Sequence, residues 1–172
     1  METDKHRGPT RPPVAIGHGY DVHRLSSNRR LVLGGVPIEH ELGLVGHSDA
    51  DVVLHAVMDA ILGASGLGDI GRHFSNTDER WKDASSVHLL DKVAVMVREH
   101  GWRVGNVDVT VIAEQPKLAP HIPAMRQTMA NRLGIDGALV NVKATTAEGL
   151  GPEGRQESIS AHAVALLIQD DG

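Results

Sequence analysis

Alternation of apolar and polar residues marks four stretches of this chain as strands. They cover residues 14–22, 104–113, 140–145 and 159–168. Side chains of a strand point alternately to its two faces, so this pattern is typical of strands with one covered face. Two short apolar runs, residues 31–33 and 36–38, flank Gly34-Gly35 and predict a β-hairpin.

Apolar residues three and four positions apart predict three helices, over residues 48–64, 85–100 and 120–133. Ser48, with Asp51 three residues later, is the expected N-cap of the first helix, in a variant of the capping box. Residues 68–78 show no periodicity and contain many turn formers, which predicts a long loop. The remaining polar stretches connect the predicted strands and helices.

The order of these elements predicts an α+β fold in which helices cover one face of a mixed β-sheet. Residues 14–170 are expected to form a single domain, because a chain of 172 residues suits one hydrophobic core. Residues 1–13 are charged and contain proline without an apolar run, so we expect a disordered tail and no secretory signal.

Composition excludes several classes of protein. The net charge of −5 argues against a nucleic-acid surface, and the chain has no apolar run long enough to span a membrane. The absence of cysteine rules out disulfides and thiolate ligands, so a bound metal would rely on histidine and carboxylate. A soluble cytoplasmic protein is the expectation.

Asp21, His23 and His55 are the strongest candidates for metal ligands. Asp21 and His23 are two residues apart in a predicted strand and therefore point to the same face. His55 lies in the first predicted helix, where Asp51, His55 and Asp59 recur every four residues. Three such ligands would leave the fourth position of a catalytic zinc open. Asp-x-His is a short pattern, and ordinary polar residues in a chain with 11 histidines are the alternative interpretation.

Other polar clusters fall at the ends of the predicted elements. Residues 46–51 precede the first helix, whose N-terminus favours an anion, although simple capping by Ser48 explains them as well. Residues 113–119 and 144–148 follow two strands and combine one lysine, hydroxyl groups and Glu148, a set that suits a nucleotide diphosphate with Mg²⁺. Taken singly, these residues are typical of solvated loops, and residues 151–157 resemble a solvated turn. Neither a P-loop nor a Rossmann motif is present.

Together these residues resemble a known family. The strings GHGYDVHRL, GGVPI, GLVGHSDADVVLHAVMDAILGASGLGDIG, NVDVTVIAEQPKLAPHIPAM and VNVKATTAEGLG occur in this order. They resemble the 2-C-methyl-D-erythritol 2,4-cyclodiphosphate synthase family of the non-mevalonate isoprenoid pathway. The resemblance extends from about Ile16 to Ile168, nearly the whole chain.

The resemblance implies a homotrimer of subunits with a ferredoxin-like sheet and active sites between subunits. It implies zinc, or another divalent cation, on Asp21, His23 and His55, and Mg²⁺ or Mn²⁺ with the substrate diphosphate on Glu148. His47 and Thr146 would stabilise the transferring phosphate, with Ser48 beside it.

The resemblance also assigns substrate contacts. The erythritol phosphate part would contact Asp69, Ile70, Gly71, Phe74, Ser75, Asn76, Thr77 and Asp78. The cytidine part would contact Ala113, Glu114, Gln115, Pro116, Lys117, Leu118, Ala119, Thr145 and Thr146. Arg155 and Glu157 would lie near the trimer axis, around a cavity for isoprenoid-like ligands.

Two positions depart from the family pattern: Asn76 replaces a common aspartate, and Pro152 replaces a frequent aromatic residue. The implied reaction is an attack of the 2-phosphate on the β-phosphate of 4-diphosphocytidyl-2-C-methyl-D-erythritol 2-phosphate, which releases CMP. This nucleophile is already ionised, so no general base is needed. The alternatives are a zinc phosphohydrolase and a non-catalytic trimer that binds metal and isoprenoids.

Overall fold

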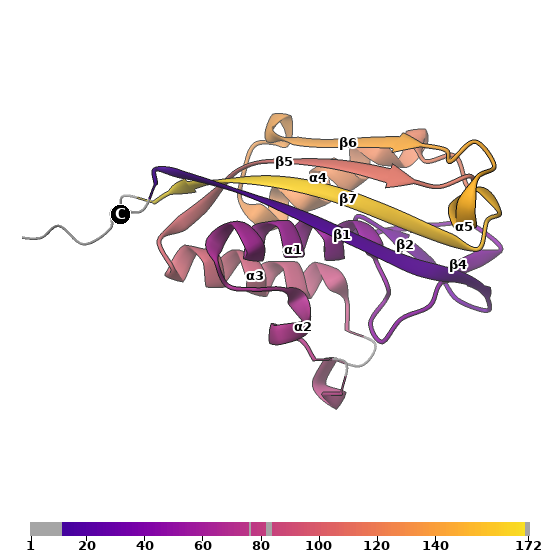
Figure 1. Cartoon of the computed structure of the whole chain (residues 1–172), viewed down its shortest axis with the longest axis horizontal. Coiled ribbons are helices and arrows are strands. Elements are labelled where there is room, and N and C mark those ends of the chain that lie inside the picture. Colours follow the sequence, from indigo (N-terminus) through magenta and orange to yellow (C-terminus); the bar gives the residue numbers. More distant parts are fainter. Residues whose placement is uncertain (1–11, 76, 82–83, 171–172) are drawn as a thin grey trace, which may run out of the picture.

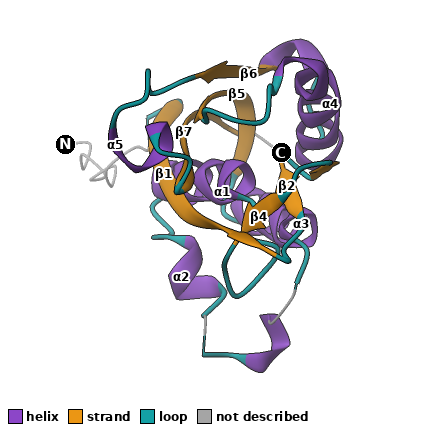
Figure 2. Cartoon of the chain, turned by 90° about the vertical axis from the view of Figure 1, so that its right-hand side faces the viewer, coloured by secondary structure: helices purple, strands orange, loops and turns teal. Residues whose placement is uncertain are grey.

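The computed structural model describes residues 12–75, 77–81 and 84–170. Its main sheet has five strands in the order β4-β1-β7-β5-β6, and β2 and β3 form a separate hairpin. The three long helices α1, α3 and α4 lie on one side of the main sheet (Figures 1 and 2). The predicted α+β architecture, with helices over one face of a mixed sheet, is therefore confirmed.

The bounds of the elements are as follows. The strands are β1 (Val14–Ser27), β2 (Leu31–Leu33), β3 (Val36–Ile38), β4 (Leu42–Leu44), β5 (Trp102–Ile112), β6 (Val140–Thr145) and β7 (Ser158–Gln169). The helices are α1 (Val52–Ser65), α2 (Ile70–His73), α3 (Ser86–Glu99), α4 (Ile122–Leu133) and α5 (Gly151–Gly154). Three 3₁₀ turns cover Glu79–Trp81, Ala119–His121 and Gly137–Leu139.

The sheet is mixed in its strand directions. β7 is antiparallel to both of its neighbours, β1 and β5, whereas β5 and β6 are adjacent and parallel. β1 and β5 therefore run in the same direction with β7 between them, which is the split β–α–β unit of ferredoxin-like folds. The second unit, β5-α4-β6, is not split, so the sheet is ferredoxin-like only in its first half.

Most of the predicted elements are present, with several differences. The first strand continues past the predicted residue 22 to Ser27. The first helix begins at Val52, and its N-cap is Asp51 instead of Ser48. The expected loop 68–78 contains the one-turn helix α2, which Asp69 caps by accepting a hydrogen bond from the Arg72 N–H. α5 occupies part of the turn expected at residues 151–157, and β4 was not predicted. These additional elements have three or four residues, too few to produce a periodic pattern.

Glycine allows α1 to lie directly on β1. A Cβ atom on Gly17 would be 2.0 Å from the carbonyl oxygen of Ala60, and one on Gly19 would be 1.9 Å from that of Ala56. Any side chain at either position would therefore push the helix off the sheet. The Gly-His-Gly sequence that precedes Asp21 is explained by this close approach.

The opposite face of the sheet carries exposed apolar residues on β1 and β7, beside polar residues on β5 and β6. Alternate residues of β1 point to it, among them Ile16, which is 71% exposed, Tyr20 and Val22, and Val164 of β7 is also exposed. Exposed apolar strands side by side are typical of a surface that another chain covers. No helix in the described part of the chain is long and apolar enough to cross a membrane.

Candidate active site

β1 and α1 bring the three predicted metal ligands together. Asp21 and His23 lie on the face of β1 that carries Gly17 and Gly19, and His55 is in the first turn of α1. One ligand atom from each of these three residues lies within 4.8 Å of the others. The predicted cluster is therefore confirmed as a geometric unit.

The distances within this cluster suit one metal ion. Asp21 Oδ2 is 3.0 Å from His23 Nε2 and 2.9 Å from His55 Nδ1, and the two histidine nitrogens are 3.3 Å apart. Ligand atoms about 2.0–2.1 Å from a tetrahedral zinc lie about 3.3 Å from one another. The three atoms can thus coordinate one divalent cation with little movement.

Contacts within the cluster shift the pKa values of Asp21 and His23. Burial would raise the pKa of Asp21, but its contacts with the ring nitrogens of His23 and His55 outweigh this effect and hold the pKa well below its usual range. Burial would lower the pKa of His23, but its contact with the Asp21 carboxylate raises that pKa. Asp21 is therefore ionised over the whole physiological pH range, as a metal ligand must be.

The orientation of His23 is determined by the segment before α1. Its Nδ1 atom is 2.7 Å from the carbonyl oxygen of Val45, so Nδ1 donates a hydrogen bond and Nε2 faces the other ligands. A Cβ atom on Gly46 would be 2.9 Å from His23 Cε1. Gly46 therefore leaves the space in which the ring lies.

The cluster opens into a cavity of about 250 Å³. Its walls combine the three ligands with residues from the segment before α1, from α2 and its C-cap, from the 3₁₀ turn Glu79–Trp81 and from α3: Gly46, His47, Ser48, Ile70, Gly71, Phe74, Trp81 and Leu89. The Nε2 atom of His47 is buried and has no hydrogen-bond partner in the described part of the chain. Such an atom is available to a polar ligand in the cavity.

The N-terminus of α1 is not a free anion site. Asp51 accepts hydrogen bonds from the N–H groups of Val53 and Leu54, and also from those of Gly34 and Gly35 in the hairpin turn. Burial raises the pKa of Asp51 to about 6, while the N–H donors favour its charged form. Asp51 thus joins the hairpin to α1 and does not line the metal-side cavity.

The predicted substrate loop contributes only some of its residues to this cavity. Ile70, Gly71 and Phe74 line it, whereas the side chains of four others are engaged locally. Asp69 caps α2, Ser75 and Thr77 hydrogen-bond each other at 2.8 Å, and Asp78 forms an ion pair with Arg80 at 2.6 Å. Asn76 lies outside the described residues.

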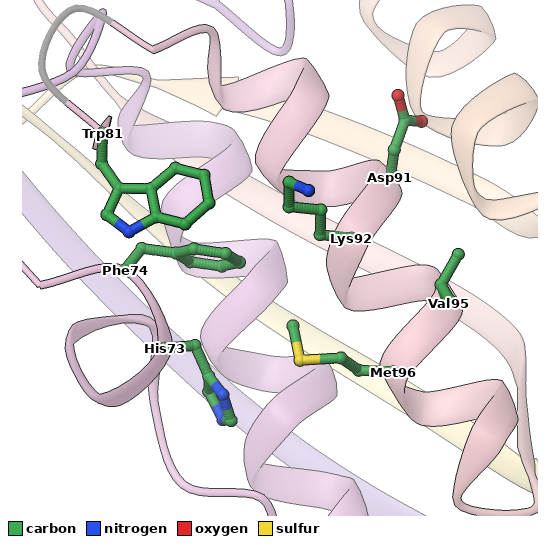
Figure 3. Close-up of a pocket in the computed structure, with 7 residues that line it drawn as sticks. All are labelled: His73, Phe74, Trp81, Asp91, Lys92, Val95 and Met96. Atoms are coloured by element: carbon green, nitrogen blue, oxygen red, sulfur yellow. The ribbon is translucent and has the colours of Figure 1, made fainter.

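Residues to which the sequence assigned no role in the site also shape this region. Trp81 packs edge-on against Phe74 at a centroid distance of 5.1 Å, and Lys92 Nζ lies 5.7 Å from the centroid of Trp81. A second cavity has a volume of about 440 Å³ and is lined by these two rings, His73 and residues of α3. Figure 3 shows the rings facing Lys92 and Met96 of α3. Asp59 accepts a hydrogen bond from the Ile70 N–H at 2.8 Å and so ties α2 to α1. The sequence signal that could have indicated Trp81 is the occurrence of a tryptophan in a turn-rich segment of a chain with few aromatic residues.

The predicted nucleotide-binding residues form a separate cavity of about 230 Å³ at the ends of β5 and β6. It is lined by Ala113, Glu114, Pro116, Lys117, Leu118, Ala119, Ala144, Thr145 and Thr146. Glu114 joins the two loops, because its Oε1 accepts hydrogen bonds from the N–H groups of Ala147 and Gly149. This cavity shares no lining residue with the metal-side cavity.

Three further predicted site residues, besides the locally engaged ones of the substrate loop, line neither of these two cavities. Gln115 precedes Pro116 through a cis peptide bond. Glu148 accepts a hydrogen bond from the hydroxyl of Thr146 at 2.7 Å, which places its carboxylate beside the nucleotide cavity. Arg155 forms an exposed ion pair with Glu157 at 3.0 Å.

Comparison with known proteins agrees with the resemblance found in the sequence. The model of the YgbB family matches residues 14–168. A 2-C-methyl-D-erythritol 2,4-cyclodiphosphate synthase from Syntrophomonas wolfei is 60% identical over 156 residues, which cover 91% of this chain and 99% of that protein. A protein of the same name from Synechococcus elongatus is 57% identical over 155 residues, which cover 90% of this chain and 97% of that protein.

Solved structures share the fold. The CDP complex of IspF from Plasmodium falciparum superposes with a TM-score of 0.82 at 32% identity, covering 94% of this chain and all of that one. The bifunctional IspDF from Campylobacter jejuni gives a TM-score of 0.88 at 44% identity over 92% of this chain, which spans 43% of that longer protein. The matched region contains the metal ligands and both cavities, and the chain belongs to the YgbB family.

Proposed function

We propose that this chain converts 4-diphosphocytidyl-2-C-methyl-D-erythritol 2-phosphate into 2-C-methyl-D-erythritol 2,4-cyclodiphosphate and CMP. The observation that carries the proposal is the Asp21–His23–His55 cluster, which offers three ligand atoms 2.9–3.3 Å apart at one end of a cavity. Relatives at 57–60% identity bear the name of this synthase. The hydrolase and the non-catalytic trimer have no comparable support.

Zinc is the proposed ion at this cluster, since two histidines and one carboxylate are a common catalytic zinc set. When bound, it supplies Lewis-acid neutralisation of phosphate charge at its free coordination position. Asp21 would contribute the negative charge of the site, and the two histidines would bind the ion as neutral ligands. The cavity beside them holds the erythritol phosphate part against Ile70, Gly71 and Phe74.

His47 and Ser48 would orient the reacting phosphates in this cavity. The buried, unpartnered Nε2 of His47 supports this role, because a phosphate oxygen would supply the missing hydrogen bond. The attacking 2-phosphate is already an anion at neutral pH, so the residues need to position it and not to deprotonate it. Holding both groups in a folded substrate can contribute roughly 7–11 kcal/mol to lowering the barrier.

The cavity at the ends of β5 and β6 is the proposed cytidine diphosphate site. Lys117 provides a cation for the phosphates, and backbone groups of the two loops are available to the base. Thr146 and Glu148, which contact each other at 2.7 Å, would lie at the phosphates, with Glu148 holding Mg²⁺ or Mn²⁺. The related Plasmodium falciparum protein was solved as a CDP complex, which supports a cytidine nucleotide as the ligand.

We propose further that each active site combines the metal side of one subunit with the nucleotide side of another. The two cavities share no lining residue, and the exposed apolar residues of β1 and β7 offer a surface for subunits to associate. A homotrimer brings three such pairs together. An isoprenoid-like ligand near Arg155 on the trimer axis, and a cytoplasmic location, are additional predictions of this proposal.

Subunit mixing tests the shared site. Asp21→Asn damages the metal side and Lys117→Ala the nucleotide side, so trimers of either variant alone should be inactive. Trimers reassembled from an equal mixture should recover about a quarter of the wild-type activity, because that share of interfaces combines two intact sides. No recovery in confirmed mixed trimers would refute a site shared between subunits. A pH–rate profile of His47→Ala that lost its basic limb would contradict the positioning role of His47.

A further inference from the structure

The side of His55 that faces away from the cluster contacts a buried serine. While His55 Nδ1 points to Asp21, His55 Nε2 lies 3.0 Å from the hydroxyl of Ser86 and 3.2 Å from that of Ser48. Ser86 is the first residue of α3 and is fully buried. Ser86 and His55 are 31 residues apart, and no sequence pattern predicts their contact.

Asp49 determines which way the Ser86 hydroxyl points. One oxygen of its carboxylate accepts a hydrogen bond from the Ser86 N–H at 2.9 Å, and the other accepts a short hydrogen bond from the Ser86 hydroxyl. A carboxylate only accepts, so the single proton of the hydroxyl is used for Asp49. The oxygen of Ser86 is then left with lone pairs, and the group facing it on His55 has to be an N–H.

This arrangement selects one of the two neutral forms of His55. With the proton on Nε2, the lone pair on Nδ1 is directed towards Asp21 and His23, which is the form that binds a metal. The opposite form would place a proton on Nδ1, where it would hydrogen-bond to Asp21 and block coordination. Ser48 alone does not decide between the two forms, because its hydroxyl can either donate to Nε2 or accept from it.

We propose that Asp49 and Ser86 are positioning residues that hold His55 in its metal-binding form, through the hydrogen-bond chain Asp49–Ser86–His55. The inference rests on the proposed metal site. Outer partners of ligating histidines strengthen metal binding by about 10- to 100-fold, and a carboxylate at the end of the chain makes the histidine a better ligand. Asp49 therefore acts on the metal through two other residues.

Zinc affinity of the full chain, measured by competition with a chelating dye, tests the chain of hydrogen bonds. Ser86→Ala should weaken zinc binding by about 10- to 100-fold, and Ser86→Thr, which keeps the hydroxyl, should restore most of the affinity. Ser85→Ala is the matched control, because Ser85 is exposed and its side chain makes no capping hydrogen bond. Asp49→Asn keeps the shape but weakens the acceptor, so it should reduce affinity several-fold.

Two further measurements separate the possible outcomes. Urea unfolding in EDTA reports the stability of each variant without metal, and a merely structural role of Ser86 would lower that stability and leave the zinc affinity of the folded protein unchanged. Zinc affinities of Ser86→Ala and Asp49→Asn within twofold of wild type would overturn the proposal. A zinc affinity that falls in Ser48→Ala but in neither of these two variants would also overturn it. If wild type and Asp21→Ala bound zinc equally, the metal site itself would be refuted instead.

Discussion

Replacement of Gly19 by alanine should disrupt the metal cluster without touching any ligand. The added Cβ would be 1.9 Å from the Ala56 carbonyl oxygen, and 3.0 Å is the closest approach that real Cβ atoms show, so α1 has to retreat from β1 by about 1 Å. Ala56 directly follows His55, whereas Asp21 and His23 are on β1. A shift of α1 away from β1 therefore increases the distance between His55 and the other two ligands.

The magnitude follows from this geometry. The neighbouring atom is backbone and not the end of a flexible side chain, so the cost in stability should lie at the upper end of overpacking, about 3 kcal/mol. A displacement of about 1 Å among atoms that are 2.9–3.3 Å apart should reduce activity by about 100-fold. Urea unfolding in EDTA measures the first effect, and zinc titration with activity measurements at saturating zinc measures the second.

Gly63→Ala provides the control in the same helix. Among the described residues, no atom beyond the adjacent backbone of α1 lies within 4 Å of a Cβ built on Gly63, which is exposed. Alanine should therefore stabilise α1 by up to about 1 kcal/mol and leave zinc binding unchanged. A Gly19→Ala protein with wild-type stability and wild-type zinc affinity would refute the argument that close contact between α1 and β1 positions His55.

Four more outcomes are expected from the structure. Gly46→Ala should weaken zinc binding about tenfold, because the new Cβ would lie 2.9 Å from the His23 ring; an unchanged zinc titration would show that the ring has room to move. Asp51→Ala should lower the free energy of unfolding by about 3 kcal/mol or more, since four N–H groups lose their acceptor, and a smaller loss in urea unfolding would mean that water replaces it. Zinc affinity should fall with decreasing pH from above pH 6.5, because the raised pKa of His23 means that zinc displaces a proton there, and a flat profile would contradict this. In the metal-free protein, the free energy of unfolding depends on pH in the opposite direction from zinc affinity. The pair of protonated His23 and Asp21 stabilises the fold below pH 6.5, and this contribution is lost as pH rises through the raised pKa of His23.

The parts of the site that follow from local periodicity could be predicted. Asp21 and His23 are two residues apart in a strand, so strand geometry places them on the same face. His55 lies on a helix, whose period likewise determines the face to which its side chain points. The hairpin about Gly34-Gly35 was predictable because its turn requires positive φ angles, which glycine adopts readily and which both residues have in the structure. The long helices and strands each carry enough residues to show their period.

The parts that depend on contacts between distant segments could not be predicted. Ser48 looked like the N-cap of the first helix, but Asp51 takes this role because the hairpin turn adds two further N–H donors that only the folded chain brings there. Ser86 is 37 residues from Asp49 and 31 from His55, and neither spacing has a local signature. Trp81 reaches the cavity only through the packing of its ring against Phe74.

The most direct test of the proposed function is product analysis. The chain, loaded with zinc, is incubated with 4-diphosphocytidyl-2-C-methyl-D-erythritol 2-phosphate and Mg²⁺, CMP is quantified, and the second product is identified by phosphorus NMR. We predict equal amounts of CMP and a cyclic diphosphate, both lost in Asp21→Asn. Absence of CMP release, or a linear bisphosphate in place of the ring, would contradict the account.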